Sequence, residues 1–376
     1  MTDEAEIRRI FDGVFGSGEG VAVASAPGRV NIIGEHTDYN EGFVLPTPLG
    51  GKIWVAAKRR DDGECQLYAS DYEERFSFTL GKQKPGASMR WANYIMGVVD
   101  AITRKGCGLG GFDLAVKGDV PQGSGLSSSA ALEVAAARAL VELFKVKLDP
   151  VELAYVGKSA ENDFLGIKSG VMDQFVASLG RFGQALFIDC RDNSHRNVKL
   201  PFGCALVAVH TGIRRGLAVS AYNERVEQCQ RGVAALRLVR PEINSLRDAK
   251  MVDLEAIDGQ VPELIYRRCR HVVRENVRVL SAVEAMGLNL GSKLGALMHE
   301  SHVSLRDDYG VSCPELDALV EVAMGTGYVL GARLTGAGFG GCTINLIQKH
   351  NLATFLEEVP RRYKTAVGLE AEVYPV

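Results

Sequence analysis

Three side chains that could do chemistry stand close together in the stretch SAPGRVNIIGEHTDYNEGFVLP, residues 25–46: Glu35, His36 and Asp38. Carboxylates and imidazole are ordinary metal ligands, but the sequence offers no second cluster that matches them. The same groups can exchange hydrogen bonds with a polyhydroxylated small molecule and reject an analogue with a misplaced hydroxyl. Taken alone, the stretch fits a solvated surface loop slightly better than either kind of site.

A glycine- and serine-rich stretch, GDVPQGSGLSSSAA (residues 118–131), follows a strand pattern and opens a helix pattern. Glycines let the backbone approach a ligand, and a helix N-terminus offers unpaired N–H groups to phosphate. Ser124 occupies the place of the P-loop lysine, so this is not a Walker A loop. A triphosphate would therefore need backbone amides, the helix dipole and Mg²⁺ held partly by a serine hydroxyl. The alternative is that Ser127, Ser128 and Ser129 only cap the helix.

A second glycine cluster, GAGFGG, matches the dinucleotide fingerprint GxGxxG at Gly336, Gly338 and Gly341. That fingerprint requires a strand before it and a helix after it. Here CTINLI follows, which has the pattern of another strand. We therefore exclude a dinucleotide site and expect a tight strand-to-strand loop that packs against the serine-rich loop.

Two further acids are candidates for chemistry. Asp173, in GVMDQF, is bracketed by apolar residues, so its charge should depend on a nearby cation, for which Arg29 is a candidate. The alternative is an acid that interacts with the dipole of a helix start. Glu161, in SAENDFLG, fits a metal carboxylate or a surface acid.

The elements that must position these residues indicate an α+β chain. A short N-terminal helix precedes strands on both sides of the polar loop, and FDLAVKG alternates apolar and polar residues with the period of a half-buried strand. Residues 150–180 and about 221–325 have helical patterns, whereas YVLGARL, CTINLI and LEAEVYPV return to strands at the end. A boundary between two lobes is expected near residues 190–205.

The segment PELIYRRCRHVVRENVRVLSAVEAMG predicts one long helix. We expect one apolar face to point toward a core: Leu264, Ile265, Cys269, Val272, Val273, Val277 and Leu280. The opposite face carries four arginines, which we interpret as a solvated face rather than a nucleic-acid patch: Arg267, Arg270, Arg274 and Arg278.

Composition excludes several classes of protein. The 376 residues are 46% hydrophobic and 24% charged, with a formal net charge of -3, so neither disorder nor general attraction to nucleic acid or anionic membranes is expected. The eight cysteines are scattered without metal-ligand spacing, which is typical of free thiols in a reducing compartment. No apolar run approaches the length of a membrane span, and we expect a cytoplasmic protein.

Taken together, these stretches resemble the galactokinases, a branch of the GHMP small-molecule kinases, along nearly the whole chain. The resemblance rests on PGRVNIIGEHTDYNEGFVLP, GSGLSSSAALEVA and LTGAGFGGC, with RWANY, MDQF and SAYNER as further matches. It implies an α+β fold of two lobes, residues 1–200 and 201–376, with the active site in the cleft between them. The first lobe would be mixed α/β, and the second would have antiparallel strands with helices.

The resemblance also implies a role for individual residues. Asp173 matches the general base and Arg29 the arginine beside it, while Ser129 and Glu161 match Mg²⁺ ligands. Sugar-binding positions are matched by Glu35, His36, Asp38, Gly170 and Tyr222. Nucleotide-binding positions are matched by Trp91, Gly123, Ser124, Gly125, Leu126, Ser127, Ser128 and Ser129.

The implied activity is Mg²⁺- and ATP-dependent phosphorylation of the anomeric hydroxyl of D-galactose, by a monomer. The alternatives are an N-acetylgalactosamine kinase and a catalytically silent sensor that binds galactose and ATP. Ser169 stands where the family often has cysteine, Ala337 replaces a common glycine, and HTGIRRGLAVSAYN departs mildly before Tyr222. None of these departures removes a catalytic group.

Overall fold

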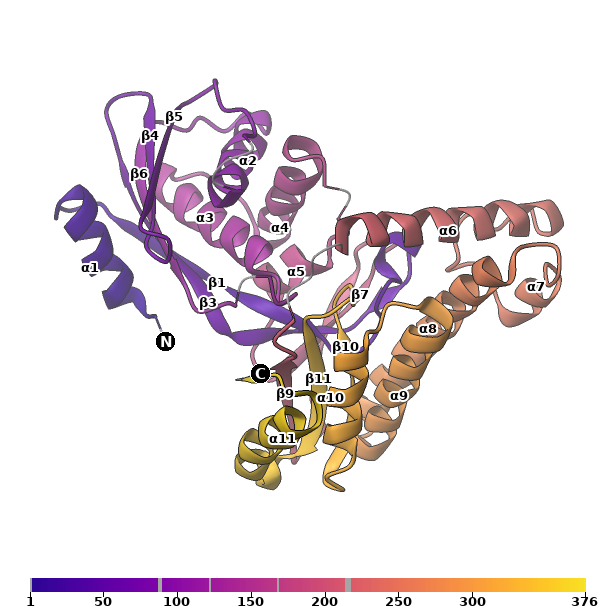
Figure 1. The fold of residues 1–376 in the computed structure, drawn as a ribbon. Helices are drawn as coiled ribbons and strands as arrows, with labels where there is room; N and C mark the ends of the chain where they lie inside the picture. Colours follow the sequence, from indigo (N-terminus) through magenta and orange to yellow (C-terminus); the bar gives the residue numbers. More distant parts are fainter. Residues whose placement is uncertain (1, 87–89, 122, 168, 214–217) are drawn as a thin grey trace. The chain divides into compact units, whose positions relative to one another are not determined.

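The computed structural model of this chain describes residues 2–86, 90–121, 123–167, 169–213 and 218–376 (Figure 1). Three stretches that the sequence analysis singles out contain positions outside these ranges. They are Gln122 in the serine-rich loop, Lys168 before Gly170, and residues 214–217 before Tyr222.

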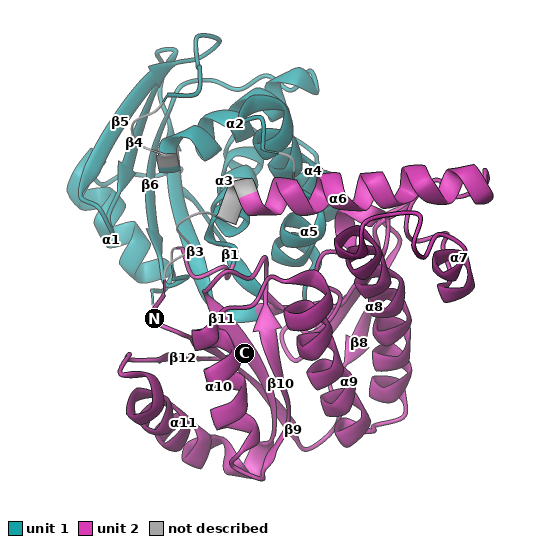
Figure 2. Cartoon of the chain, turned by 45° about the vertical axis from the view of Figure 1, so that its right-hand side comes forward, with its two compact units in different colours: residues 1–29, 49–122, 127–180 teal, residues 30–48, 123–126, 181–376 magenta. Residues whose placement is uncertain are grey.

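The chain divides into two compact units (Figure 2). Unit 1 comprises Met1–Arg29, Leu49–Gln122 and Ser127–Gly180, and unit 2 comprises Val30–Pro48, Gly123–Leu126 and Arg181–Val376. The boundary expected near residues 190–205 falls inside unit 2, which also takes two short N-terminal segments. Buried contacts explain this interleaving, because Glu35 pairs with Arg333 and the Cys342 thiol donates to the Ser124 carbonyl.

Unit 1 is built on a five-stranded sheet in the order β1-β3-β6-β4-β5. Its strands are β1 (Ala22–Asn31), β3 (Pro46–Arg59), β4 (Glu64–Ala69), β5 (Glu74–Thr79) and β6 (Phe112–Gly118), of which β1 ends and β3 begins in unit 2. Its helices are α1 (Glu4–Phe15), α2 (Arg90–Arg104), α3 (Ser128–Phe144), α4 (Pro150–Ser159) and α5 (Met172–Leu179). A π-helical turn, Ala160–Phe164, follows α4 directly.

Both faces of the unit 1 sheet are covered (Figure 1). Asp3 caps the N-terminus of α1, because its Oδ1 accepts a hydrogen bond from the Glu6 amide, and the helix buries Ile7 and Phe11 against the sheet. Helices α2 to α5 pack on one another against the opposite face. The strand predicted at FDLAVKG is confirmed, with Leu114 buried on that face and Ala115 buried under α1.

Unit 2 contains two sheets, with orders β10-β11-β9-β12 and β2-β7-β8. The strands are β2 (Phe43–Val44), β7 (Gln184–Asp189), β8 (His195–Lys199), β9 (Cys204–His210), β10 (Val329–Thr335), β11 (Cys342–Gln348) and β12 (Glu372–Pro375). The helices are α6 (Ala218–Val239), α7 (Met251–Glu255), α8 (Glu263–Gly287), α9 (Gly291–Ser304), α10 (Pro314–Met324) and α11 (Leu352–Val367). Short 3₁₀ turns lie at Asp38–Asn40 and Lys349–Asn351, and a π-helical turn at Leu305–Tyr309 follows α9.

The four-stranded sheet of unit 2 is antiparallel throughout. Helices α10 and α11 bury Leu319 and Phe355 against Val207 and Val209 of its central strand β9. Helix α9 packs on β10, where Gly295 and Gly331 let the two backbones meet. The strands predicted in this part of the chain are confirmed, and the predicted α+β character holds for both units.

The prediction for the long helix is only partly right. In α8, Ile265, Cys269, Val272 and Val273 are buried as expected. Three other members of the expected core face are exposed instead, with Val277 61%, Leu280 46% and Leu264 44% exposed. Arg278, expected on the solvated face, is buried and its Nε donates to Glu275 at 2.7 Å. The reason is that the side of α8 facing the loop at residues 34–43 carries polar residues, which hydrogen-bond to that loop. Part of the apolar surface of the helix therefore faces solvent.

Among the described residues, no helix combines the length and the apolar character that crossing a bilayer requires.

The close approach of α9 and β10 gives a test of the packing in unit 2. A Cβ at Gly331 would lie 2.1 Å from the backbone oxygen of Gly295, which cannot move away as a flexible side chain would. We expect Gly331→Ala to lower the free energy of unfolding by about 1–3 kcal/mol. A matched control is Gly287→Ala at the end of α8, where a Cβ meets nothing within 4 Å. Equal stability of the two variants in urea denaturation would contradict this packing.

Candidate active site

A bidentate ion pair links Arg29 and Asp173 in unit 1. Arg29 lies near the end of β1, and Asp173 is the second residue of α5. The Arg29 Nε donates to Asp173 Oδ1 and its Nη2 to Oδ2, both at 2.7 Å. The arginine is buried, whereas 30% of the Asp173 side chain stays exposed. The pairing expected from the sequence is thus present, and it leaves the carboxylate accessible to a substrate.

Ser127 completes this group by donating its hydroxyl to Asp173 Oδ2. It precedes α3 with a φ of 58°, in the left-handed region that residues with a Cβ rarely adopt, and its side chain makes no capping hydrogen bond. The alternative that this serine only caps the helix is therefore wrong. Strain of this kind is often found at functional sites, where the surrounding structure holds it.

Ser129, in the first turn of α3, and Glu161, which follows α4, are joined by a hydrogen bond. The Ser129 hydroxyl donates to Glu161 Oε1 at 3.2 Å, and the Ser169 hydroxyl donates to Oε2 at 2.5 Å. Glu161 lies in the π-helical turn after α4, a local irregularity frequent at functional sites. Burial raises the pKa of Glu161, and the charge of Asp173 raises it further. This is a buried carboxylate rather than a surface acid.

Sequence reasoning missed a third acid beside these two, Glu133. It is fully buried in α3, where its Oε2 accepts a hydrogen bond from Gln174 at 3.0 Å. Burial raises the pKa of Glu133 well above its usual value, and the charges of Glu161 and Asp173 add to the effect. The sequence held one sign of this burial: Glu133 stands among alanines in SSSAALEVAAARAL, and the structure buries most of that helix.

Two further residues that the family resemblance singled out also lie in unit 1. Trp91 is buried at the start of α2, and its Nε1 donates to Glu74 Oε2 at 2.7 Å, which fixes the plane of the indole. Gly170 is half-buried, shortly before α5 and Asp173.

Glu35 anchors the polar loop in unit 2. Its carboxylate accepts hydrogen bonds from Asn31 at 2.8 Å, from the Gly336 amide at 2.8 Å and from the Thr335 hydroxyl at 3.2 Å, and it pairs with Arg333 at 2.7 Å. Burial raises its pKa, although Arg333 opposes this shift. The loop is therefore a buried, hydrogen-bonded structure, and its interpretation as a solvated surface loop is wrong.

Aromatic side chains surround His36, the residue after Glu35 in this loop. Its Nδ1 lies 2.8 Å from the Tyr39 hydroxyl, and its Nε2 lies 3.2 Å from the Ala337 carbonyl. The His36 ring centroid is 4.7 Å from that of Tyr309 and 5.8 Å from that of Tyr222. The structure thus brings the predicted residues His36 and Tyr222 together. Tyr39 and Tyr309, whose hydroxyls are 2.7 Å apart, were missed. Asp38 is the first residue of the 3₁₀ turn Asp38–Asn40 and is half-buried.

Helix α8 supports the loop from beneath with three buried polar side chains. The Gly34 amide donates to Glu275 at 2.9 Å, and the Phe43 amide donates to Asn276 at 2.9 Å. His271 Nε2 lies 3.2 Å from the Glu35 carbonyl. None of these three residues stood out in the sequence, because they are spread over an amphipathic helix.

The glycine-rich loops meet within unit 2. Gly123 and Gly125 have positive φ, with Ser124 and Leu126 buried between and beside them. The Cys342 Sγ lies 3.4 Å from the Ser124 carbonyl, at the end of the 336–341 loop. That loop joins β10 to β11, which confirms the predicted strand-to-strand loop: a strand follows the glycines where the dinucleotide fingerprint requires a helix.

Comparison with known proteins matches three segments of the chain to family descriptions. They are "Galactokinase galactose-binding signature" at residues 9–59, "GHMP kinases N terminal domain" at 93–181 and "GHMP kinases C terminal" at 282–365. A relative named galactokinase from Roseiflexus sp. (strain RS-1) is 44% identical over 374 residues, 100% of this chain and 95% of the relative. Another, from Chloroflexus aggregans, is 41% identical over 98% of this chain and 94% of its own length. This chain belongs to the galactokinase family.

Solved structures agree with membership of the galactokinase family. Lactococcus lactis galactokinase, solved in complex with galactose, superimposes with a TM-score of 0.93 at 35% identity, over 99% of this chain and 97% of that one. Methanococcus jannaschii mevalonate kinase has a TM-score of 0.66 at 19% identity, over 94% and 97% of the two chains, and shares the fold. The predicted GHMP kinase fold and the assignment as a sugar kinase are confirmed.

The buried His271 of α8, which contacts the polar loop, predicts a specific pH dependence of the free energy of unfolding. Burial lowers the pKa of His271 to about 4, so the ring is neutral in the folded protein, while it takes up a proton in the unfolded chain below about pH 6.5. The stability that this neutral histidine contributes is therefore present above that pH and lost as the pH falls toward 4. We expect the advantage of the wild type over His271→Gln to shrink by about 1.4 kcal/mol for each pH unit below 6.5.

Urea denaturation at several pH values measures this difference. The control is His350→Gln, which changes an exposed histidine. If the difference in free energy of unfolding between the wild type and His271→Gln stays constant between pH 7 and pH 5, His271 does not cause this pH dependence.

Proposed function

We propose that this chain transfers the γ-phosphoryl group of ATP to the anomeric hydroxyl of D-galactose, giving galactose 1-phosphate and ADP. The observation that carries the proposal is the group of Arg29, Asp173 and Ser127, in a chain that also bears the galactose-binding signature. A carboxylate held at both oxygens by a guanidinium is oriented for proton transfer, and its exposed side can accept the proton of a sugar hydroxyl.

In this mechanism Asp173 is the general base. It accepts the proton of the anomeric hydroxyl as that oxygen attacks the γ-phosphorus, a step that supplies about 10²–10⁴-fold of the acceleration. Arg29 holds the carboxylate and balances its charge. The remaining acceleration comes from positioning and from electrostatic stabilisation of the transferring phosphoryl group.

Ser129 and Glu161 would hold Mg²⁺ with the nucleotide. No group of three or more His, Cys, Asp or Glu side chains is arranged to hold a metal in the part of the chain that is described. Mg²⁺ needs no such cage, because it keeps several waters and phosphate oxygens as ligands and takes one or two from the protein. A hydroxyl and a carboxylate 3.2 Å apart are hard oxygen donors that fit this requirement. When bound, the ion would neutralise charge on the phosphates.

The remaining residues would bind the two substrates. Glu35, His36, Asp38, Gly170 and Tyr222 are proposed to orient the sugar, with Glu35 acting mainly by holding the loop, because its oxygens already have protein donors. Backbone amides of residues 123–129 are proposed to receive the phosphates, and Trp91 to border the base. That the enzyme acts as a cytoplasmic monomer stays a prediction from the sequence.

Phosphorylation assays test the function directly. The purified protein is given ATP and either galactose, N-acetylgalactosamine, glucose, mevalonate or homoserine, with Mg²⁺ or with EDTA. We expect Mg²⁺-dependent formation of galactose 1-phosphate, with the other acceptors slow. Faster turnover of N-acetylgalactosamine would identify the kinase for that sugar. Galactose binding without turnover of any acceptor would identify a sensor.

The base assignment has its own test. We expect Asp173→Asn to lower kcat by about 10²–10⁴-fold while galactose still binds, because the change removes the proton acceptor and leaves the polar loop intact. The matched control is Asp163→Asn, an exposed acid of the nearby π-helical turn, which should turn over normally. Near-normal kcat in Asp173→Asn would show that another group takes the proton.

A further inference from the structure

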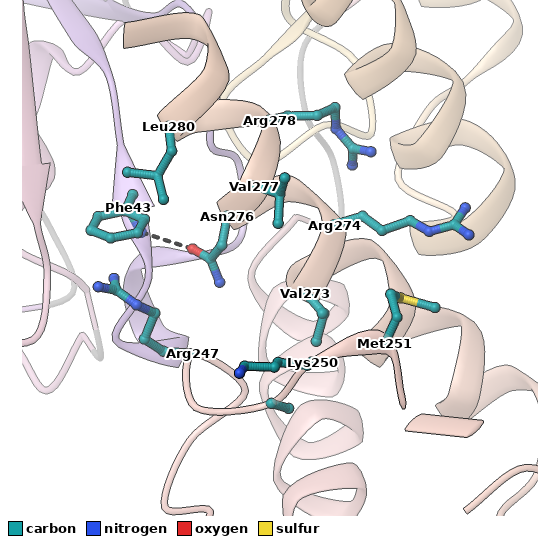
Figure 3. A pocket seen from close by; sticks show the side chains of 11 residues that line it. Phe43, Arg247, Lys250, Met251, Val273, Arg274, Asn276, Val277, Arg278 and Leu280 are labelled. Atoms are coloured by element: carbon teal, nitrogen blue, oxygen red, sulfur yellow. Dashed lines mark hydrogen bonds between the residues drawn. The ribbon is translucent and has the colours of Figure 1, made fainter. Parts of the chain in front are cut away.

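Unit 2 contains a cavity of about 440 Å³ on the exposed side of α8 (Figure 3). Its walls come from α8, from residues 247–251 and from Phe43. The volume falls within the range of small-molecule sites, about 300–1,000 Å³. Neither the mechanism proposed above nor the galactose-binding signature uses the residues of α8 that line it.

The lining of this cavity is strongly cationic. Arg247, Lys250, Arg274 and Arg278 contribute to it, whereas no aspartate or glutamate among the described residues does. Arg247 is paired with Asp189 at 3.1 Å, and Arg278 with Glu275 at 2.7 Å. Lys250 and Arg274 are exposed and form no ion pair within the described ranges. Two positive charges at the cavity are therefore uncompensated.

Apolar side chains line the same cavity. Val273, Val277, Leu280, Met251 and Phe43 all border it, and Val277 and Leu280 are among the exposed hydrophobic residues of the protein. In Figure 3, Leu280, Val277 and Val273 project from α8, with Phe43 on one side of them and Met251 on the other. An occupant with an apolar body would remove this surface from water, which is favourable in proportion to the area covered.

Two buried polar atoms of residues that line the cavity, Asn276 Nδ2 and Arg278 Nη2, have no hydrogen-bond partner among the described residues. Asn276 is 7% exposed, its Oδ1 accepts from the Phe43 amide, and its buried Nδ2 has no hydrogen-bond acceptor among the described residues. Figure 3 shows this nitrogen pointing to the side of Arg247 and Lys250. A buried donor without a partner costs about 1–3 kcal/mol. An oxygen of a ligand on the cavity floor would satisfy it.

We propose that this cavity is a regulatory site for a small phosphate monoester with an apolar body. A phosphate monoester carries a charge of about -1.5 to -2 at pH 7, which matches the two uncompensated cations. Figure 3 shows the exposed side chains of Arg274 and Lys250 pointing to opposite sides, so in the complex both would turn toward the phosphate oxygens and donate to them, while Val277 and Leu280 cover the apolar part.

An occupant of the cavity would act on the polar loop, because both share the same side chains. Asn276 holds the Phe43 amide, and the Arg247 guanidinium lies 3.4 Å from the centroid of the Phe43 ring. Arg278 holds Glu275, which in turn holds the Gly34 amide. Binding in the cavity therefore stabilises both ends of the loop at residues 34–43. This coupling rests on the proposed function of that loop in binding galactose.

Titration with phenyl phosphate tests the site itself, by calorimetry with Mg²⁺, ADP and galactose present to occupy the active site. We expect binding that weakens about tenfold in Arg274→Gln, which removes one charged donor, and that is lost in Val277→Glu, which places a negative charge in the cavity. Both changes are at exposed positions of α8, so folding should be preserved. Arg231→Gln, an exposed arginine of α6 outside the cavity, is the matched control and should bind normally.

Three outcomes of this titration would overturn the site: no binding to the wild type, equal affinity in all variants, or equally tight binding of phenol or inorganic phosphate. Equal binding of phenol would mean that the charge is not recognised, and equal binding of phosphate that the apolar body contributes nothing.

Galactose affinity measured without ATP tests the coupling. Saturating phenyl phosphate should tighten the galactose Kd about fivefold, and Arg274→Gln should abolish this effect. Unchanged galactose affinity alongside tight phenyl phosphate binding would refute the coupling and leave the site standing. Failure of galactose to bind at all would refute the proposed function and the coupling together, while the first titration still decides the site.

Discussion

The structure of unit 2 depends on the buried ion pair between Glu35 and Arg333. Both side chains are almost fully removed from water, so each charge would be strongly unfavourable without the other. The hydrogen bonds from Asn31, Thr335 and Gly336 satisfy the remaining lone pairs of the carboxylate. Together these contacts fasten residues 30–48 to β10, and this segment consequently folds with the C-terminal half of the chain rather than with its sequence neighbours.

The same constraint explains the unusual surface of α8. The loop that Glu35 fastens buries the backbone amides of Gly34 and Phe43, and buried amides require acceptors. Helix α8 provides Glu275 and Asn276, and Arg278 balances the charge of Glu275. Burial alone would raise the pKa of Glu275, but the charge of Arg278 and other neighbours lower it to about 2. Meeting these polar requirements turns Val277 and Leu280 outward.

In unit 1, three neighbouring acids raise a related question of how buried negative charge is compensated. Asp173 has a guanidinium partner, Glu161 has serine hydroxyls, and Glu133 has, within the described part of the chain, only an amide donor from Gln174. The raised pKa values of Glu133 and Glu161 reflect burial without a cation beside them. Of these three acids, Asp173 is the one with a guanidinium partner and a partly exposed side chain, which is the geometry that its proposed role as the base requires. A cation bound next to Glu161 would stabilise its charged form.

The sequence by itself determined the strands and helices that carry the site, the glycine-rich loops and the family, because these depend on local patterns and on motifs of contiguous residues. It also offered Arg29 as a candidate partner of Asp173, since an acid among apolar residues needs a cation, and the structure contains this pair. Only the tertiary structure decided that Glu35 meets Arg333, that Tyr309 reaches His36, and that Glu133 lies beside Glu161. These contacts join residues far apart in the chain. The expected core face of α8 failed for the same reason: apolar periodicity assumes that a helix buries its hydrophobic residues, whereas here distant backbone amides required buried polar partners.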